Sequence, residues 1–171
     1  GVNLRTGHSA EELVREEDGW QIAAATPLGQ RTVSARHVIV ATPAPAAAAL
    51  VASTDNELAE LLSEISYARL AVVHTGLARD SVGHPLDGTG FLAPKGESSI
   101  LTGNMWMSTL FPNRAPQGKI LLTSYLGGAR APQVADWDDG RLADEALATL
   151  RPLIGLKADP EMVRIDRHQE A

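Results

Sequence analysis

The chain of 171 residues contains no cysteine, which excludes disulfide bonds, thiol catalysis and thiolate metal sites together. It has no excess of basic residues either: the formal net charge is −6 and the isoelectric point is near 5.3. This balance argues against nucleic acid or an anionic membrane surface as a partner. A long hydrophobic run is also missing. The most apolar stretch, residues 41–52, is interrupted by Pro43 and Pro45 and is too short to span a bilayer.

Neither terminus has the features of a natural domain end. Gly1 is not an initiator methionine, and no basic segment followed by an apolar core marks a signal peptide. The last five residues, 167–171, follow a strand-like run without a turn or cap. We therefore expect an internal segment of a longer protein, made of one domain or of one domain plus a fragment of another.

No motif for self-contained catalysis stands in a suitable context. Residues 88–93 spell a G-x-G-x-x-A dinucleotide fingerprint, but Pro94 and Gly96 follow where that mechanism needs a helix N-terminus. The five histidines have no metal-ligand spacing, and no G-x-S-x-G nucleophile elbow is present. Arg114 lies in a proline-containing loop, where we expect it to hold the loop through carbonyl groups or a carboxylate rather than to bind an anion.

The first part of the chain predicts short strands joined by tight turns. Asp18-Gly19 and Leu28-Gly29 are typical of hairpin turns, because glycine readily adopts the positive φ that such turns need. The last of these strands is a short apolar run that suits burial on both faces. The predicted strands are Val2–Arg5, Ala10–Val14, Trp20–Ala25, Arg31–Ser34 and His37–Ala41.

The remainder predicts helices and further strands without an internal repeat. A helix at 43–51 begins with prolines, and a second follows a capping box of Thr54 and Glu57. The apolar stripe of this second helix comprises Leu58, Leu61, Leu62 and Ile65. A third helix runs from about Asp138 to Leu153, with Asp136 or Asp138 as N-cap and Gly155 as its stop. The predicted strands are Leu70–Leu77, Gly90–Ala93, Ser99–Met105, Lys119–Leu126 and Met162–Asp166.

Five segments, read in order, form a more specific pattern. Three carry most of it: the G-x-G-x-L-x-P run at 88–94, the F-P-x-R-A-P run at 111–116 and the L-G-G turn at 126–128. The others are G-W-Q-I at 19–22 and H-V-I-V-A-T-P-A at 37–44. In this pattern nearly the whole chain resembles the oxygen-dependent protoporphyrinogen oxidases, a family of the flavin-containing amine oxidase superfamily.

The resemblance implies an FAD enzyme that strips hydrogens from protoporphyrinogen IX and passes them to oxygen, giving protoporphyrin IX for haem synthesis. It implies an α+β fold, with a mixed, mainly antiparallel sheet and two to three helices preceded by a small β-meander. Residues 1–43 would be a returning fragment of the FAD-binding domain, and residues 44–171 the substrate-binding domain. The family's flavin-binding glycine motifs lie outside this chain. We therefore expect FAD in the full-length protein but not bound to this chain alone, which we expect to be inactive.

The resemblance also assigns site residues. Family positions that sandwich the macrocycle match Gly90, Leu92, Thr102 and Tyr125. Positions near the FAD match Ala10, Ala41, Thr42, Pro43 and His168. The family tends to have larger apolar residues at 102 and 125, an aromatic residue at 89 and a frequent tryptophan at 168. No catalytic residue and no metal ligand is assigned.

The expected partners are a tetrapyrrole substrate and the remaining FAD-domain segments of the same protein, with no nucleic acid. The resemblance implies a cytoplasmic location, with membrane attachment only peripheral, on the inner face and through segments absent here. Two alternatives stay open: an isolated tetrapyrrole-binding module, and a substrate domain of another flavin amine oxidase or a carotenoid desaturase. Leu92 and Tyr125 are also compatible with a plain core, and Gly90 with a turn, because apolar pockets and cores look alike in sequence.

Overall fold

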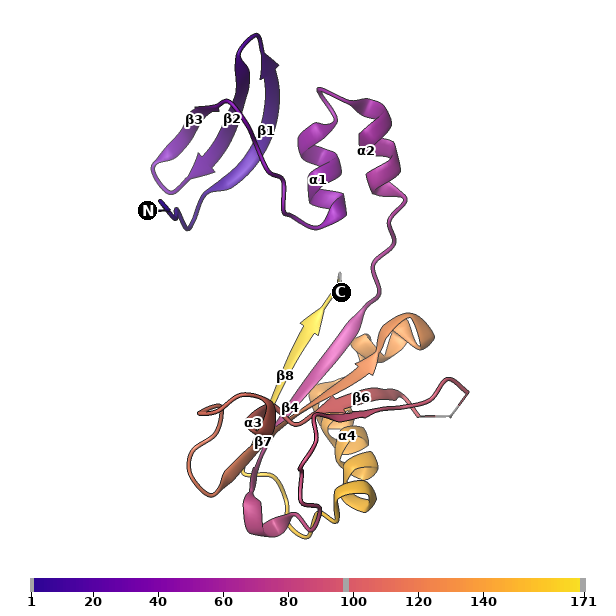
Figure 1. Cartoon of the computed structure of the whole chain (residues 1–171). Helices are drawn as coiled ribbons and strands as arrows, with labels where there is room; N and C mark the ends of the chain where they lie inside the picture. The colour runs from indigo at the N-terminus through magenta and orange to yellow at the C-terminus, as the bar shows by residue number, and fades with distance from the viewer. Residues whose placement is uncertain (1, 97–98, 170–171) are drawn as a thin grey trace. The chain divides into compact units, whose positions relative to one another are not determined.

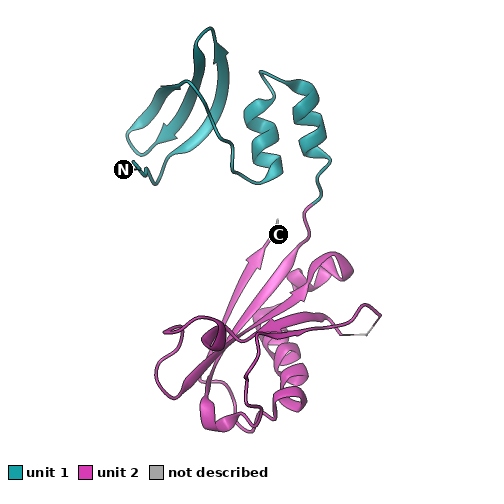
Figure 2. Ribbon diagram, viewed as in Figure 1, with its two compact units in different colours: residues 1–66 teal, residues 67–171 magenta. Residues whose placement is uncertain are grey.

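A computed structural model describes residues 2–96 and 99–169 of the chain. The chain divides into two compact units, one ending at Ser66 and the other beginning at Tyr67 (Figure 2). The domain boundary expected at Pro43 lies inside the first of these units. As a division between an FAD-binding fragment and a substrate-binding domain it stays a prediction.

Unit 1 begins with a three-stranded antiparallel meander (Figure 1). Its strands β1 (Ser9–Glu16), β2 (Gly19–Thr26) and β3 (Gly29–Ala35) pair in chain order. Gly19 is required where the chain re-enters β2, since a Cβ there would lie 2.6 Å from the carbonyl oxygen of Ala35. The predicted β-meander is confirmed.

Two other predicted strands of unit 1 are wrong. Residues 2–5 and 37–41 have no strand structure. The second run was expected to be buried on both faces, yet the side chain of Ile39 is 91% exposed. A doubly buried strand needs hydrogen-bonded neighbours at its edges and cover on both sides. No described residue of unit 1 pairs with this run.

Two helices complete unit 1: α1 (Ala44–Val51) and α2 (Asn56–Ser63). Their small core joins Leu13 of β1 to Ala48, Val51 and Ala59. The predicted helices are present, but much of the apolar stripe of α2 stays exposed, with Leu61 at 57%. The core of unit 1 therefore uses the alanine face of α2 rather than its leucines.

The predicted capping box at Thr54 is wrong by one residue. Asp55 is the N-cap of α2, and its carboxylate accepts a hydrogen bond of 2.9 Å from the amide of Leu58. The Thr54 hydroxyl instead donates to the carbonyl of Val51 at 3.0 Å. Thr54 therefore caps the C-terminal end of α1, because the last carbonyl groups of a helix have no partner within the helix.

Unit 2 is built on a five-stranded antiparallel sheet with strand order β5-β6-β7-β4-β8. Each strand predicted for this part of the chain is present, although β6 starts two residues later than expected. The strands are β4 (Leu70–Ala78), β5 (Gly90–Leu92), β6 (Leu101–Met105), β7 (Lys119–Gly127) and β8 (Met162–His168).

The long helix α4 (Asp139–Ile154) has the ends that the sequence predicts. The Asp138 side chain caps it by accepting from the amide of Arg141 at 2.9 Å, and Gly155 ends it in the left-handed conformation. The other helical segments of unit 2 are short: α3 (Met107–Leu110), η1 (Arg79–Ser81), η2 (Gly128–Arg130) and η3 (Pro132–Asp136). The α+β class is confirmed, with α3 as the one α-helix that was not expected among the described residues.

Helix α4 packs against one face of the sheet. Its residues Leu142, Ala146, Leu150 and Ile154 recur every four positions and are buried. They meet fully buried side chains from the two central strands, including Val73, Leu77, Leu122 and Leu126. This packing fixes which residues of each strand point inward and leaves the opposite face of the sheet for other contacts. No helix within the described residues is long and apolar enough to cross a membrane.

We predict that Leu150→Ala lowers the free energy of unfolding by about 2–5 kcal/mol, because it leaves a cavity between α4 and the sheet. The matched control is Leu153→Ala on the same helix, where the side chain is 53% exposed. The control should change the same quantity by less than about 1 kcal/mol. Urea denaturation of both variants measures the difference, and equal losses would contradict the packing described here.

Candidate functional site

The face of the unit 2 sheet that α4 does not cover carries three of the four predicted substrate residues. Strand pairing aligns residues across it in two neighbouring rows, and paired residues share a face of a sheet. The first row is Leu92, Gly103, Tyr125, Val72 and Asp166. The second row is Gly90, Met105, Thr123, His74 and Arg164. We call these ten residues the open face.

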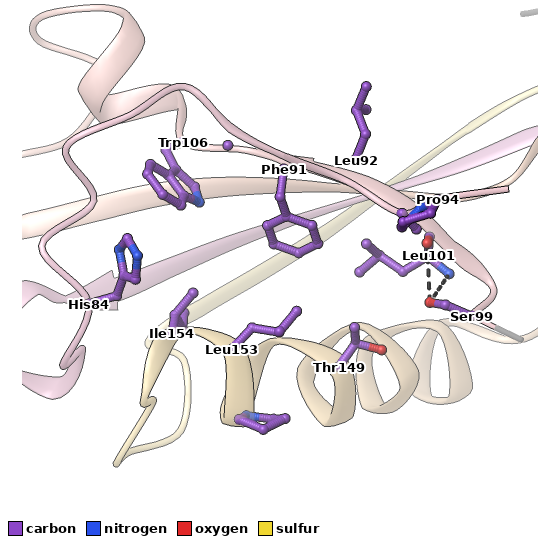
Figure 3. Close-up of a pocket in the computed structure, with 13 residues that line it drawn as sticks. His84, Phe91, Leu92, Pro94, Ser99, Leu101, Trp106, Thr149, Leu153 and Ile154 are labelled. Carbon is purple, nitrogen blue, oxygen red and sulfur yellow. Dashed lines mark hydrogen bonds between the residues drawn. The ribbon is translucent and has the colours of Figure 1, made fainter. Parts of the chain in front are cut away.

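The β5–β7 side of the open face is apolar. Leu92 is 84% exposed, and its side chain points away from α4, while that of Phe91 points toward the helix (Figure 3). Leu92 lies over Gly103, where a Cβ would approach the Leu92 Cδ2 atom to 2.8 Å. The Tyr125 hydroxyl donates to the Met105 sulfur at 3.3 Å. Leu92, Met105 and Tyr125 thus form a surface suited to a flat apolar ligand.

The β4–β8 side of the open face is polar and linked by hydrogen bonds. His74 Nε2 lies 3.3 Å from the Asp166 carboxylate, and His74 Nδ1 lies 2.9 Å from the Thr123 hydroxyl. With Nε2 donating to the carboxylate, Nδ1 of the neutral ring accepts from Thr123. The Arg164 guanidinium donates to the other Asp166 oxygen at 2.9 Å. Both nitrogens of His74 are therefore engaged.

These contacts lower the pKa of the Asp166 carboxyl group. The hydrogen bond from Arg164 is the largest cause that holds the pKa of Asp166 below its ordinary value, and the charges of Arg164, His74 and His168 add to it. Partial desolvation acts in the opposite direction and is outweighed. Asp166 is therefore ionised at neutral pH and places a fixed negative charge at the border of the apolar surface.

Gly90 and Thr102 have clear backbone roles. Gly90 has φ 138°, and a Cβ there would lie 2.0 Å from the carbonyl oxygen of Asn104, so the tight β5–β6 pairing requires glycine. Thr102 lies at the register shift between Leu101 and Gly103, where its hydroxyl donates to the Tyr125 carbonyl at 3.0 Å. Any contact of either residue with a ligand stays a prediction.

The residues predicted near FAD belong to different units. Ala10 pairs with Ala24 in the meander, Ala41 and Thr42 are exposed in the segment before α1, and Pro43 is the N-cap of α1. His168 pairs with Leu70 at the end of β8 in unit 2.

The four residues of unit 1 that are predicted near FAD show whether this unit alone could enclose the cofactor. Of the four predicted contacts there, Thr42 alone adds a polar side chain, and all four are exposed. Such residues can touch one edge of a flavin but do not enclose it. The described residues of unit 1 therefore do not fit a complete FAD site by themselves.

A cavity of about 620 Å³ lies on the α4 side of the sheet (Figure 3), and two of the four predicted substrate residues, Gly90 and Leu92, are among the residues that line it. Phe91, Leu101 and Trp106 from the sheet side face Leu153 and Ile154 of α4 across it. The rings of His84 and Trp106 lie 5.0 Å apart at its end. The sequence predicted no role for Phe91, although it lies between Gly90 and Leu92 on β5. Among the described residues, no group of three or more His, Asp or Glu side chains is placed to hold a metal ion.

The fold and these residues define a known class of protein. The family model for flavin containing amine oxidoreductase matches residues 1–169, so the chain belongs to that family. The resemblance inferred from the sequence is thereby confirmed at the level of the family.

The curated relatives of this chain include oxidases named for porphyrinogen substrates. Protoporphyrinogen oxidase 1, chloroplastic, of Arabidopsis thaliana is 28% identical over 145 residues, covering 81% of this chain and 27% of the relative. Coproporphyrinogen III oxidase of Bacillus subtilis (strain 168) is 30% identical over 142 residues, covering 82% of this chain and 29% of the relative. The chain thus spans less than a third of the length of either relative.

A solved structure supports the fold alone. Cyclohexylamine oxidase from Brevibacterium oxydans IH-35A matches with a TM-score of 0.65 at 15% identity, covering 93% of this chain and 33% of that chain. That enzyme is named for an amine and not for a porphyrinogen, so the shared architecture does not decide the substrate.

We predict that Asp166 titrates below the ordinary Asp range of about 3.9. Because its folded pKa is lowered, the stabilisation from its charged form is present above that ordinary value. It is lost as the pH falls through the lower folded value. Carbon NMR of the Asp166 carboxyl group measures the titration directly.

Two variants separate the causes of this shift. Arg164→Gln should move the pKa of Asp166 upward more than His74→Gln does, because the hydrogen bond from Arg164 is the largest cause. A larger upward shift in the His74 variant would overturn this order.

Proposed function

We propose that the chain is part of an FAD-dependent porphyrinogen oxidase and supplies the face on which the tetrapyrrole lies. The observation that carries this proposal is the open face, where Leu92, Met105 and Tyr125 form an apolar surface beside the Asp166–His74 pair. The pyrrole rings of a porphyrinogen match the apolar part of such a surface, and their N–H groups match its carboxylate. The porphyrinogen substrates named for the relatives support the same choice.

The reaction proposed first is the oxidation of protoporphyrinogen IX to protoporphyrin IX for haem synthesis. Coproporphyrinogen III is the second candidate substrate, because the Bacillus subtilis coproporphyrinogen III oxidase matches 82% of this chain at 30% identity. Both substrates share the reduced macrocycle, so the open face would hold either one in the same way.

The chain's own residues would bind and orient the substrate. FAD, when bound in the full-length protein, supplies the chemistry that accepts hydrogens from the substrate. Leu92 and Tyr125 would contact the macrocycle and exclude water from it, while Gly103 leaves room for the Leu92 side chain. Asp166, held ionised by Arg164, would accept hydrogen bonds from pyrrole N–H groups at the border of this surface.

Unit 1 would contribute to the cofactor side of the enzyme. Ala10, Ala41, Thr42 and Pro43, with His168 of unit 2, would contact the FAD once the remaining FAD-domain segments are present. The exposed apolar side chains of unit 1, such as Ile39 and Leu61, support contact with those segments, because water-exposed apolar surface of this kind is stabilised by cover. The cytoplasmic location and any peripheral membrane attachment stay predictions from the resemblance.

The test is oxidation of porphyrinogens by the full-length protein that contains this chain. The rise of porphyrin fluorescence from protoporphyrinogen IX and from coproporphyrinogen III is compared with the oxidation of amines. We expect turnover of a porphyrinogen. Oxidation of amines without porphyrinogen turnover would contradict the proposal.

We predict that Leu92→Asp lowers kcat/KM for the porphyrinogen by at least about tenfold, because it places a charge against the apolar macrocycle. Leu28→Asp is the matched control: Leu28 is 85% exposed and Leu92 84%, but Leu28 lies in the β2–β3 turn of unit 1. The control should keep the activity of the parent protein. Equal loss in both variants would show that the open face has no special role.

A further inference from the structure

We infer that the cavity between the sheet and α4 is a binding site for an uncharged aromatic molecule that carries a carbonyl group. The cavity holds about 620 Å³ and lies on the side of the sheet that faces α4, so it is separate from the open face. The inference goes beyond the proposed function, because it concerns a second ligand and is tested by binding rather than by turnover.

The size and the charge of the cavity limit the kind of ligand that it can hold. Pockets of about 300–1,000 Å³ hold drug-sized molecules, and this cavity falls within that range. No Asp, Glu, Lys or Arg occurs among the described residues that line it. A porphyrinogen carries ionised propionate groups, and these would be desolvated here without a counter-ion. The cavity therefore favours an uncharged ligand over a tetrapyrrole acid.

Aromatic rings form one end of the cavity. The rings of His84 and Trp106 lie 5.0 Å apart with their planes tilted by 55°, and Phe91 lies beside Trp106 along the same wall (Figure 3). Leu153 and Ile154 of α4 form the opposite wall. Aromatic rings favour tilted or offset contacts with other rings, beyond the area that they bury. A planar aromatic body therefore suits the space between these rings and the two aliphatic side chains.

The indole N–H of Trp106 supplies a polar contact. Trp106 is 7% exposed, and its Nε1 atom is buried without a hydrogen-bond partner among the residues that the structure describes. The edge of the indole remote from Nε1 lies against Gly88, where a Cβ would approach Cζ3 to 3.2 Å. Nε1 therefore lies on the edge that faces Phe91 (Figure 3). A buried donor without a partner destabilises the unliganded protein, and an acceptor atom of a ligand would relieve this cost.

His84 adds a second donor at the same end of the cavity. Its Nδ1 atom accepts a hydrogen bond of 2.9 Å from the amide of Leu86, so the neutral ring carries its proton on Nε2. Trp106 and His84 both donate, which makes an acceptor the complementary group of the ligand. A carbonyl oxygen is an uncharged acceptor with two lone pairs, so it can take a hydrogen bond from each ring.

The backbone holds Trp106 in this position without a ligand. Its amide donates to the carbonyl of Thr89 at 3.0 Å, and its carbonyl accepts from the amides of Thr109 and Leu110, each at 3.0 Å. A wall that is formed in advance lowers the cost of ordering side chains on binding. Because Nε1 is closed off from water, the acceptor must enter from the cavity, and Leu153, at 53% exposed, has the freedom to turn aside.

The cavity and the open face share the three-residue strand β5. The side chain of Phe91 faces the cavity, whereas that of Leu92 points to the opposite side (Figure 3). Gly90 and Leu92, which are predicted to contact the tetrapyrrole, also border the cavity. A ligand in the cavity and a tetrapyrrole on the open face would therefore contact β5 from its two sides without competing for one surface.

The experiment uses fluorenone as the probe, and fluorene, which lacks the carbonyl oxygen, as its matched control. In the full-length protein labelled at tryptophan nitrogen, the indole N–H of Trp106 gives one NMR signal, which Trp106→Phe removes and so assigns. We expect fluorenone to move this signal downfield, because the N–H gains a hydrogen bond, and to leave the signals of Trp20 and Trp137 in place. Trp106→Phe should raise Kd for fluorenone about two- to tenfold more than Kd for fluorene, since only the ketone loses a hydrogen bond.

A second variant tests the location of the site. Leu153→Trp places a larger side chain in the cavity wall and should raise Kd for both compounds at least about tenfold. Leu61→Trp is the matched control, because Leu61 is 57% exposed but lies on α2 in unit 1, and it should bind fluorenone as the parent protein does. A Trp106 signal that stays in place at saturating fluorenone, or one that moves equally in Leu153→Trp, would overturn the site. Porphyrinogen turnover is measured separately, so either result leaves the test of the proposed function unaffected.

Discussion

The burial of one face of an antiparallel sheet beneath α4 is the constraint on which unit 2 depends. Leu142, Leu150 and Ile154 of the helix fill the space above Val73 and Leu122. Fully burying a single leucine stabilises a fold by roughly 1.5–3 kcal/mol, so this contact fixes the direction of every strand residue beneath it. The alternation along each strand then decides, without further interactions, which side chains reach the opposite face.

The same constraint protects the register of the open face. A slip of one residue in β7 would turn Leu122 and Leu126 out of the core and Tyr125 into it, at the cost of several buried side chains. Gly90 further restricts the pairing of β5 with β6, because any side chain at this position would collide with the backbone of β6. The core packing thus also sets the order of Leu92 on β5, Tyr125 on β7 and Asp166 on β8 across the open face.

The two candidate roles on this face depend on different physics. The apolar contacts at Leu92 and Tyr125 are non-directional and suit many flat ligands. The charge at Asp166 is directional and would select among such ligands by their hydrogen-bond donors. A site of this kind leaves oxidation chemistry to a cofactor and uses the protein for position, which agrees with the absence of a catalytic motif in the sequence.

The sequence by itself determined most of the local structure. Periodicity placed α4 and the strands of unit 2, since the apolar spacing of Leu142, Ala146 and Leu150 and the alternation around Tyr125 are local properties of the chain. It could not decide the fate of apolar runs that need a partner. Residues 37–41 have the composition of a buried strand, yet no described strand of unit 1 pairs with them, and Ile39 is exposed. Strand formation depends on a hydrogen-bonded neighbour, which composition does not encode. Only the tertiary structure brought His74, Asp166 and Arg164 together on the open face. Such contacts join residues from opposite ends of the chain, and their distances follow from strand pairing rather than from sequence separation.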